Sequence, residues 1–170
     1  VLLAENATGY SNLLKLTSKA SLEGFYYRPR FDLELLDQHK DGLICTSACL
    51  AGPVSTHLLD GNVDKAEELA GTLAEMFGKD RFYVEIQDHG IPEHDQINPD
   101  LVRLARRLDL PLVAANDVHY LNQEDAAIQE LLICIQTNRT LDDPNRMKMS
   151  SDQMYFKSPA EMSSLFGHLP

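Results

Sequence analysis

Two side chains that can bind a metal ion follow a short apolar run near the middle of the chain. The run from Leu112 to Ala115 is typical of a buried strand, and Asp117 and His119 come directly after it. Residues two apart on an extended chain point to the same side, so we expect this carboxylate and imidazole to project together from the end of the strand. A pair of this kind supplies part of a divalent metal site.

Length and composition indicate one soluble globular domain over residues 1–170. The chain has 170 residues, of which 44% are hydrophobic and 24% charged. Its formal charge of −11 argues against a general nucleic-acid-binding surface, but it is compatible with a nucleic-acid enzyme inside a larger assembly. No apolar run reaches the roughly 18 residues that a membrane-spanning helix needs, so no membrane partner is expected.

The cysteines predict a cytoplasmic protein, and the first residues predict that the chain is part of a longer one. Cys45, Cys49 and Cys134 are odd in number and lack the spacing of a disulfide framework, which favours a reducing, cytoplasmic setting. The chain starts at Val1 without a methionine, and its first residues resemble the interior of a strand. We therefore expect it to begin partway through a longer protein.

Strands alternate with helices along the sequence, which predicts an α/β fold with a parallel sheet and crossover helices. Strands are expected at residues 43–48, 82–86 and 112–115. In such folds functional groups gather at the carboxyl ends of the strands. Cys49, Asp88 with His89, and Asp117 with His119 all follow strands in this way, so they form one candidate site.

Periodic apolar residues and capping signals predict the helices. Asp32 is a predicted N-cap, Gly78 a predicted C-cap, and Ser158 to Glu161 a predicted capping box. We expect the helix at residues 123–136 to turn Ala126, Ala127, Leu131 and Ile135 inward. The predicted helices cover residues 10–22, 33–39, 53–59, 63–77, the region of 101–108, 123–136 and 159–166.

Residues 24–30 form an aromatic and basic loop with two interpretations. Tyr26 and Tyr27 lie beside Arg28 and Arg30, a combination that can stack on a nucleotide. The simpler interpretation is that the aromatic rings pack the loop onto the body of the protein, and the sequence favours it. The other polar candidates also have simple interpretations, because His94 is expected to be a surface histidine and Cys45 and Cys134 core residues.

Five segments of the chain together form a recognisable pattern, and they are residues 43–52, 83–90, 115–121, 140–145 and 155–166. In this pattern the chain resembles the PHP (polymerase and histidinol phosphatase) domain family, in the form found at the N-terminus of bacterial replicative DNA polymerase III alpha subunits. The resemblance covers nearly the whole chain and keeps the family's order and spacing. It places the chain in the C-terminal portion of such a domain, up to the start of the polymerase region.

The resemblance implies a distorted seven-stranded β/α barrel with up to three divalent metal ions at the strand ends. It assigns metal ligation to Cys49, Asp117 and His119, and it places the family's other six ligand positions upstream of Val1. Asp88 and His89 are not reserved for metal in the family and remain weak candidates. Zinc is expected most strongly because Cys49 adds a soft thiolate, with manganese or iron as alternatives.

The resemblance leaves two main functions open for the intact domain. One is a metal-dependent 3′→5′ exonuclease acting on a DNA 3′ end, in which metal-bound water attacks the phosphodiester. The other is a module with a vestigial metal site that supports the polymerase and docks a separate proofreading exonuclease and other replisome proteins. A stand-alone phosphatase is less favoured. The 170-residue chain alone is expected to be inactive, with exposed apolar helix faces, because it holds only three ligand positions.

Overall fold

A computed structural model describes residues 1–169 and divides them into two compact units. The first unit contains Val1–Glu85 and Leu101–Val113, and the second contains Ile86–Asp100 and the residues from Ala114 onward. The prediction that the chain is a single domain stays a prediction. Within residues 1–169, no helix is both long enough and apolar enough to cross a membrane.

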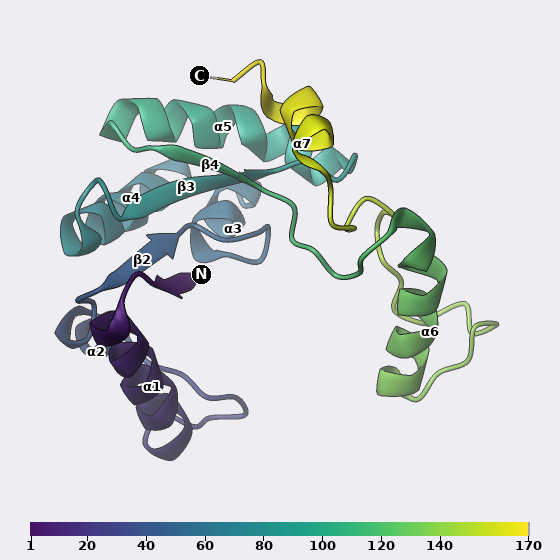
Figure 1. Ribbon diagram of the computed structural model, residues 1–170, viewed down its shortest axis with the longest axis horizontal. Coiled ribbons are helices and arrows are strands. Elements are labelled where there is room, and N and C mark those ends of the chain that lie inside the picture. The colour runs from purple at the N-terminus through teal and green to yellow at the C-terminus, as the bar shows by residue number, and fades with distance from the viewer. Residues whose placement is uncertain (170) are drawn as a thin grey trace. The chain divides into compact units, whose positions relative to one another are not determined.

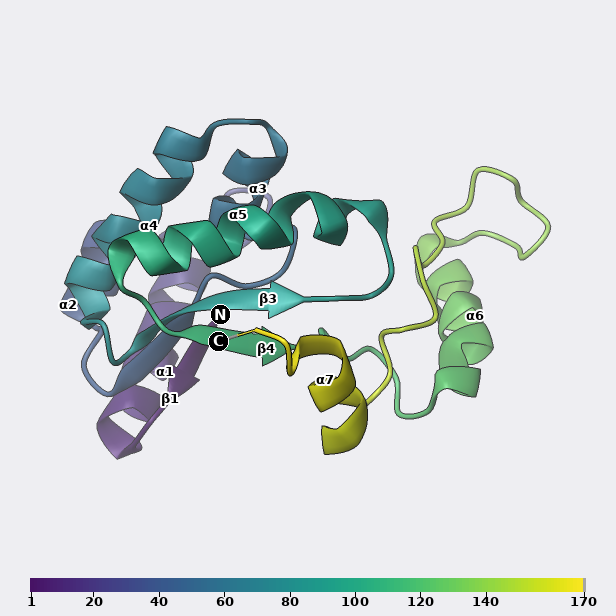
Figure 2. The ribbon, with the colours of Figure 1, turned by 90° about the horizontal axis from the view of Figure 1, so that it is seen from above.

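Four strands form one sheet in the order β1-β2-β3-β4 (Figure 1). They are β1 (Leu2–Ala4), β2 (Leu43–Thr46), β3 (Phe82–Gln87) and β4 (Leu112–Ala115). β2 pairs in parallel with β3, and Figure 2 shows β3 and β4 running in the same direction. β1 instead pairs antiparallel with β2, with Leu2 opposite Cys45, so the all-parallel prediction is wrong at this edge. Residues 1–169 thus form an α/β fold with a mixed four-stranded sheet, compatible with part of a β/α barrel.

The helices begin and end close to where the sequence predicts them. The largest difference is in the fifth helix, which starts at Pro92, well before the apolar residues that predicted it, and carries Pro99 inside it. The helices are α1 (Ala7–Leu22), α2 (Leu33–Gln38), α3 (Pro53–Leu59), α4 (Val63–Phe77), α5 (Pro92–Leu108), α6 (Ala126–Thr137, preceded by a 3-10 turn at Gln123–Asp125) and α7 (Pro159–Phe166).

The predicted capping interactions are present in the structure. The Asp32 carboxylate accepts a hydrogen bond from the backbone N–H of Leu35 at 2.9 Å, and this fixes the start of α2. Ser158 and Glu161 form a reciprocal capping box at the start of α7, with Pro159 in its first turn. Gly78 follows α4 with φ of +82°, a conformation that favours glycine.

The core of the first unit lies between the sheet and its helices. Leu43, Phe82 and Val84 are completely buried on β2 and β3, and Leu16 of α1 is 1% exposed. Helices α3 and α4 contact each other, and α4 also contacts β2. Cys45 and Cys134 are buried as expected, and all three cysteines are free. The end of β2, which Cys49 follows, is therefore supported by a packed apolar core.

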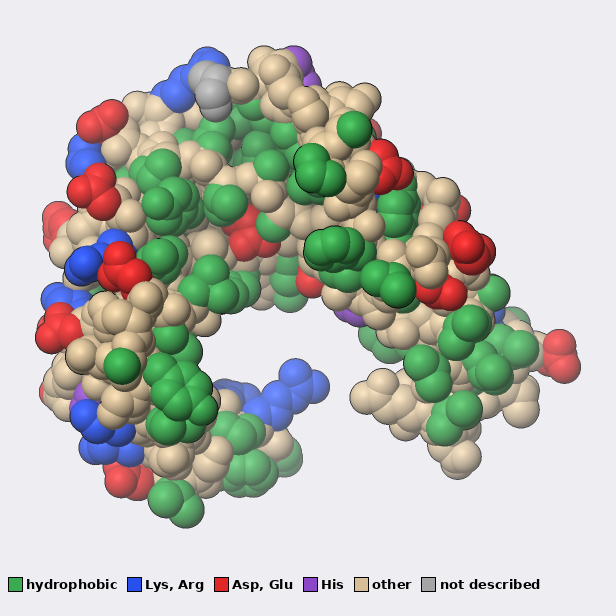
Figure 3. All heavy atoms as spheres, in the orientation of Figure 1, with side chains coloured by type: hydrophobic (Ala, Val, Ile, Leu, Met, Phe, Trp, Pro, Cys, Tyr) green, Lys and Arg blue, Asp and Glu red, His purple; other side chains and the backbone are tan. Residues whose placement is uncertain are grey.

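Helix α6 does not bury the face that its sequence predicts. Leu131 is 47% exposed and Ile135 69% exposed, whereas Ile133 and Cys134 are the buried residues of the helix. Figure 3 shows the apolar side chains gathered over α6. The inward prediction for Leu131 and Ile135 is wrong because a helix with apolar residues on most of its circumference has no single face that its sequence can identify.

Candidate metal centre

Asp117 and His119 lie in a turn after β4 rather than on an extended strand end. β4 stops at Ala115, and Asp117 has φ of +42°, in the left-handed region. The predicted alternation of side chains along an extended chain therefore does not apply. The strand itself is also less buried than predicted, because Ala114 is exposed and its three neighbours in β4 are half-buried.

The turn still connects the two predicted ligands. The His119 ring nitrogen Nδ1 lies 2.6 Å from the backbone carbonyl oxygen of Asp117. With its proton on Nδ1, the ring donates to this carbonyl and leaves the lone pair of Nε2 available. Metal-binding histidines characteristically donate their second ring N–H to a carbonyl or carboxylate in this way. His119 is exposed and Asp117 half-buried, so both can be reached from solvent.

Cys49 lies in the first unit, three residues after β2. It is half-buried, and its carbonyl oxygen accepts a hydrogen bond from the N–H of Gly52 at 2.8 Å, which closes a turn. Cys45 differs because burial raises the pKa of its thiol to about 11, so it stays protonated in the core. Of the two cysteines near the end of β2, only Cys49 is in a position suited to ligation.

The donor set fits a divalent metal by its chemistry. A thiolate, a carboxylate and an imidazole are all ligands that zinc accepts. Cys49 belongs to the first unit, and Asp117 and His119 belong to the second. Among residues 1–169, no three His, Cys, Asp or Glu side chains form a group that could hold a metal ion.

Glu85 is a buried carboxylate beside the end of β2 that the sequence alone did not single out. Its side chain is 8% exposed, and Oε2 accepts a hydrogen bond from the Thr46 hydroxyl at 2.5 Å. Its backbone N–H donates to the Ser47 hydroxyl oxygen at 2.8 Å. These contacts tie the end of β2 to β3. In the sequence, this residue could have been recognised because it is a glutamate among the apolar residues of a predicted strand.

His89 and His94 form a buried pair in the second unit. Both are 2% exposed, and their rings lie 4.8 Å apart at 70°. His89 Nε2 lies 2.8 Å from the carbonyl oxygen of Asn116, and the backbone N–H of His89 donates to His94 Nδ1 at 3.2 Å. The surface prediction for His94 is wrong because α5 starts earlier than its apolar residues indicate. His89 is engaged with the turn that carries Asp117, and Asp88 caps a bend by accepting from the N–H of Gly90.

Asn116 connects this turn to the segment before α7. Asn116 is 8% exposed, and its amide nitrogen donates to the carbonyl oxygens of Gln153 and Tyr155 at 3.1 and 2.6 Å. Its amide oxygen accepts from the Lys157 ammonium at 3.2 Å, and that ammonium also contacts the carbonyl oxygen of Gln153. The ammonium lies 4.2 Å from the centre of the Tyr155 ring. We call Asn116, Lys157 and His89 the turn clamp, because their hydrogen bonds join the turn to the segments around it.

Burial sets the ionisation of the buried cations and histidines. Burial lowers the pKa of His94, and the neighbouring His89 lowers it further. Burial also lowers the pKa of His89, against the opposing effect of its hydrogen bond to Asn116, and it lowers the pKa of Lys157. The histidine pair is therefore neutral over a wider pH range than free histidines are.

We expect the stability of the 170-residue chain to fall when the pH drops below the ordinary histidine pKa of 6.5. Because the folded-state pKa of His94 is lowered, the unfolded chain takes up a proton first. The stability contributed by neutral His94 is thus present above pH 6.5 and is lost as the pH falls through the lowered pKa. Protonation of Nδ1 also breaks its hydrogen bond from His89. Urea unfolding at a series of pH values measures the effect.

His94→Asn is the matched control for this pH dependence. Asparagine can place an acceptor oxygen where Nδ1 lies, but it does not titrate. The variant should lose less stability than the original chain between pH 7.5 and pH 5.5. Equal losses in the two proteins would contradict a buried neutral His94, and the carboxylates would then account for the whole dependence.

Comparison with known proteins adds a family and a set of relatives. The family model described as "PHP domain" matches residues 1–89. A protein named DNA polymerase III subunit alpha from Treponema pallidum is 50% identical over the whole chain, which covers 14% of that protein. The proteins of the same name from Borreliella burgdorferi and Thermus aquaticus are 48% and 45% identical over 100% and 96% of the chain, which covers 15% and 13% of their lengths. The chain therefore spans a small part of the curated relatives it matches.

Proposed function

This chain belongs to the PHP domain family, and from that membership we propose that it is part of a DNA polymerase III alpha subunit in which Cys49, Asp117 and His119 bind a divalent metal. We call the longer protein the parent protein. Identity of 50% along all 170 residues supports this assignment. The proposal covers the parent protein's DNA-directed DNA polymerase activity, its cytoplasmic location and its contact with the remaining polymerase chain.

The turn at Asp117 is the single observation that carries the metal proposal. The hydrogen bond from His119 Nδ1 to the carbonyl of Asp117 fixes the ring and leaves Nε2 available as a ligand. The turn clamp then holds the backbone of this turn through hydrogen bonds between buried residues of the same unit. Asp88 and His89 are left outside the ligand set, because both make structural contacts within the unit.

The proposed reaction of the intact domain is hydrolysis of a phosphodiester at a DNA 3′ end. Zinc is the preferred ion because of Cys49, with manganese or iron as alternatives and up to three ions in the intact domain. A divalent ion supplies Lewis acidity there, by which it lowers the pKa of water and offsets negative charge on the phosphate. In this reaction the residues of this chain would orient the imidazole of His119 and keep the Asp117 carboxylate in a fixed turn.

A docking function for the same domain is favoured by the exposed face of α6. Ile128, Leu131, Leu132 and Ile135 are between 47% and 69% exposed along one helix. A contiguous apolar surface of this kind is characteristic of an interaction site. In this alternative the domain supports the polymerase and its proofreading exonuclease partner, and its metal site is vestigial.

A nuclease assay on the full-length parent protein separates the two functions. We expect metal-dependent 3′→5′ degradation of single-stranded DNA that Asp117→Asn abolishes. The matched control is Asp142→Asn, which changes an exposed aspartate of the same unit. Both variants should keep polymerase activity. Unchanged degradation by the Asp117→Asn protein would exclude the nuclease proposal, and absence of degradation by the unmodified protein would favour the docking function.

A further inference from the structure

The aromatic and basic loop between α1 and α2 is exposed instead of packed. Phe25 and Tyr26 are each 64% exposed, and Tyr27 is 82% exposed. The simpler interpretation of the sequence, in which these rings pack the loop onto the body, is therefore wrong. Three neighbouring aromatic rings facing solvent need another explanation, because aromatic side chains usually bury most of their surface.

A backbone hydrogen bond and a residue in the left-handed region shape the loop. Tyr26 N–H donates to the carbonyl oxygen of Arg28 at 3.1 Å, and Tyr27 has φ of +58°. At the base of the loop, Gly24 approaches the carbonyl of Arg30 so closely that an added Cβ would lie 2.0 Å from its oxygen. A bulky residue in the left-handed region costs about 1 kcal/mol or more, and such strain is concentrated at functional sites.

The loop carries two arginines without carboxylate partners. Arg28 and Arg30 are exposed, and within residues 1–169 neither forms an ion pair. Arg30 instead lies 5.4 Å from the centre of the Tyr26 ring, and the Tyr26 and Tyr27 rings are 4.6 Å apart, edge to face. Arg81, by contrast, is paired with Glu5 at 3.2 Å. In a chain of net charge −11, two neighbouring unpaired guanidinium groups indicate an anionic ligand.

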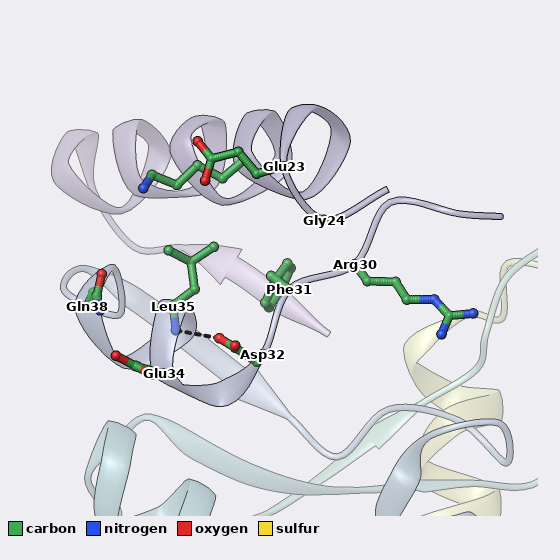
Figure 4. Close-up of a pocket in the computed structure, with 9 residues that line it drawn as sticks. Glu23, Gly24, Arg30, Phe31, Asp32, Glu34, Leu35 and Gln38 are labelled. Atoms are coloured by element: carbon green, nitrogen blue, oxygen red, sulfur yellow. Dashed lines mark hydrogen bonds between the residues drawn. The ribbon is translucent and has the colours of Figure 1, made fainter. Parts of the chain in front are cut away.

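The loop ends, at Phe31, next to the residues that follow β2 and precede Cys49. Phe31, its last aromatic residue, lines one pocket together with Ser47 and Ala48. Figure 4 shows a second pocket, between α1 and α2, in which Phe31 and Leu35 lie beneath α1. The Arg30 side chain extends away from the carboxylates of this pocket, which belong to Glu23, Asp32 and Glu34. Its charge is thus directed away from the acidic groups that could neutralise it.

We propose that residues 24–31 form a binding loop for single-stranded DNA, in which Tyr26 and Tyr27 stack on bases and Arg28 and Arg30 contact phosphates. The inference deepens the proposed function by assigning a surface for the substrate strand near Cys49. Only unpaired bases present their faces to aromatic rings, so a single strand fits better than a duplex. Tyrosine and arginine are also frequent in protein interfaces, but two unneutralised cations beside solvent-exposed rings match a polyanion with stacking faces better.

Photo-crosslinking of the full-length parent protein tests this loop without requiring catalysis. The probe is an oligothymidylate with 5-iododeoxyuridine near its 3′ end, kept intact by a chelator, and crosslinked peptides are located by mass spectrometry. We expect crosslinks at Tyr26 or Tyr27 well above those at Tyr10, which is 61% exposed on α1 of the same unit. An excess of unlabelled single strand should compete, and the same amount of duplex should compete poorly.

Loop variants give the expected size of the effect. Tyr26→Ala should lower the crosslink at Tyr27 by about 5-fold or more, because one stacked base contributes about 1–3 kcal/mol. Arg28→Gln with Arg30→Gln should make the crosslink yield less dependent on salt, whereas Tyr10→Ala should change neither quantity. Unchanged thermal unfolding of each variant confirms that the exposed loop was altered without loss of the fold.

The outcomes distinguish this inference from the nuclease proposal. If the loop crosslinks but the parent protein does not degrade DNA, the binding loop is supported. Only the nuclease proposal is then contradicted. Crosslinks confined to other parts of the parent protein, with none at residues 24–31, overturn the inference. Loss of a protein partner from the Tyr26→Ala variant, with no DNA crosslink in the unmodified loop, also overturns it and makes the loop a protein-binding surface.

Discussion

Replacing His119 with alanine in the parent protein is expected to lower its affinity for the divalent metal by more than about 100-fold. Changes to residues that only support a ligand already lower affinity by about 10- to 100-fold, so loss of the ligand itself should exceed that range. The Nδ1 hydrogen bond to Asp117 fixes the ring, and therefore little of the ligand's contribution is lost to ordering it. Competition with a fluorescent chelator measures the affinity.

His168→Ala is the control for the change at His119. His168 is an exposed histidine of the same unit and has no predicted role in ligation. Its variant should bind metal as the unmodified protein does. If His119→Ala also left the affinity unchanged, His119 would not be a ligand and the turn at Asp117 would have a purely structural role.

Replacing Asn116 with alanine should lower the free energy needed to open the turn by about 2–4 kcal/mol. The change removes two hydrogen bonds to the carbonyls of Gln153 and Tyr155 and leaves the buried Lys157 ammonium without its side-chain acceptor. Each buried polar group left without a partner costs about 1–3 kcal/mol, and more if it is charged. No new contact available to alanine offsets these losses.

Hydrogen exchange of the parent protein measures this local opening. The amide of His119 donates to Met154 at 2.8 Å, and that of Phe156 donates to Tyr120 at 3.2 Å, so both report on the clamped turn. In Asn116→Ala they should exchange about 30-fold faster or more, as the loss of 2 kcal/mol implies. Asn145→Ala, at an exposed position, should leave both rates unchanged. Equal protection in the Asn116→Ala protein would mean that the turn is held by other contacts.

Local signals in the sequence predicted the secondary structure because they act within a few residues. Asp32, Gly78 and the capping box at Ser158 each complete the hydrogen bonds of one helix end. The order of strands and helices predicted the α/β class, because each element could also be identified from its own local sequence pattern. Strand direction depends on distant pairing, so the antiparallel placement of β1 was missed. Residues 1–169 contain a sheet of four strands, so the seven strands of the expected barrel stay a prediction.

Burial was predicted less well because it depends on residues far apart in the chain. His94 and Asn116 are polar residues in polar segments, and only their tertiary neighbours show that they are buried. Ile135 and Tyr27 are the opposite case, since apolar character predicted burial and the structure exposes both. The residue types at the candidate metal centre were readable from sequence, whereas the left-handed turn at Asp117 and its clamp were not.

Cobalt substitution of the parent protein tests most directly whether Cys49, Asp117 and His119 share a metal. Cobalt takes the place of zinc, and a bound thiolate gives a near-ultraviolet charge-transfer band that oxygen and nitrogen ligands do not give. We predict that the unmodified protein shows this band, that Cys49→Ser loses it but keeps visible cobalt absorption, and that His119→Ala weakens both. A protein that binds cobalt without the band, or whose band persists in Cys49→Ser, would contradict the shared site.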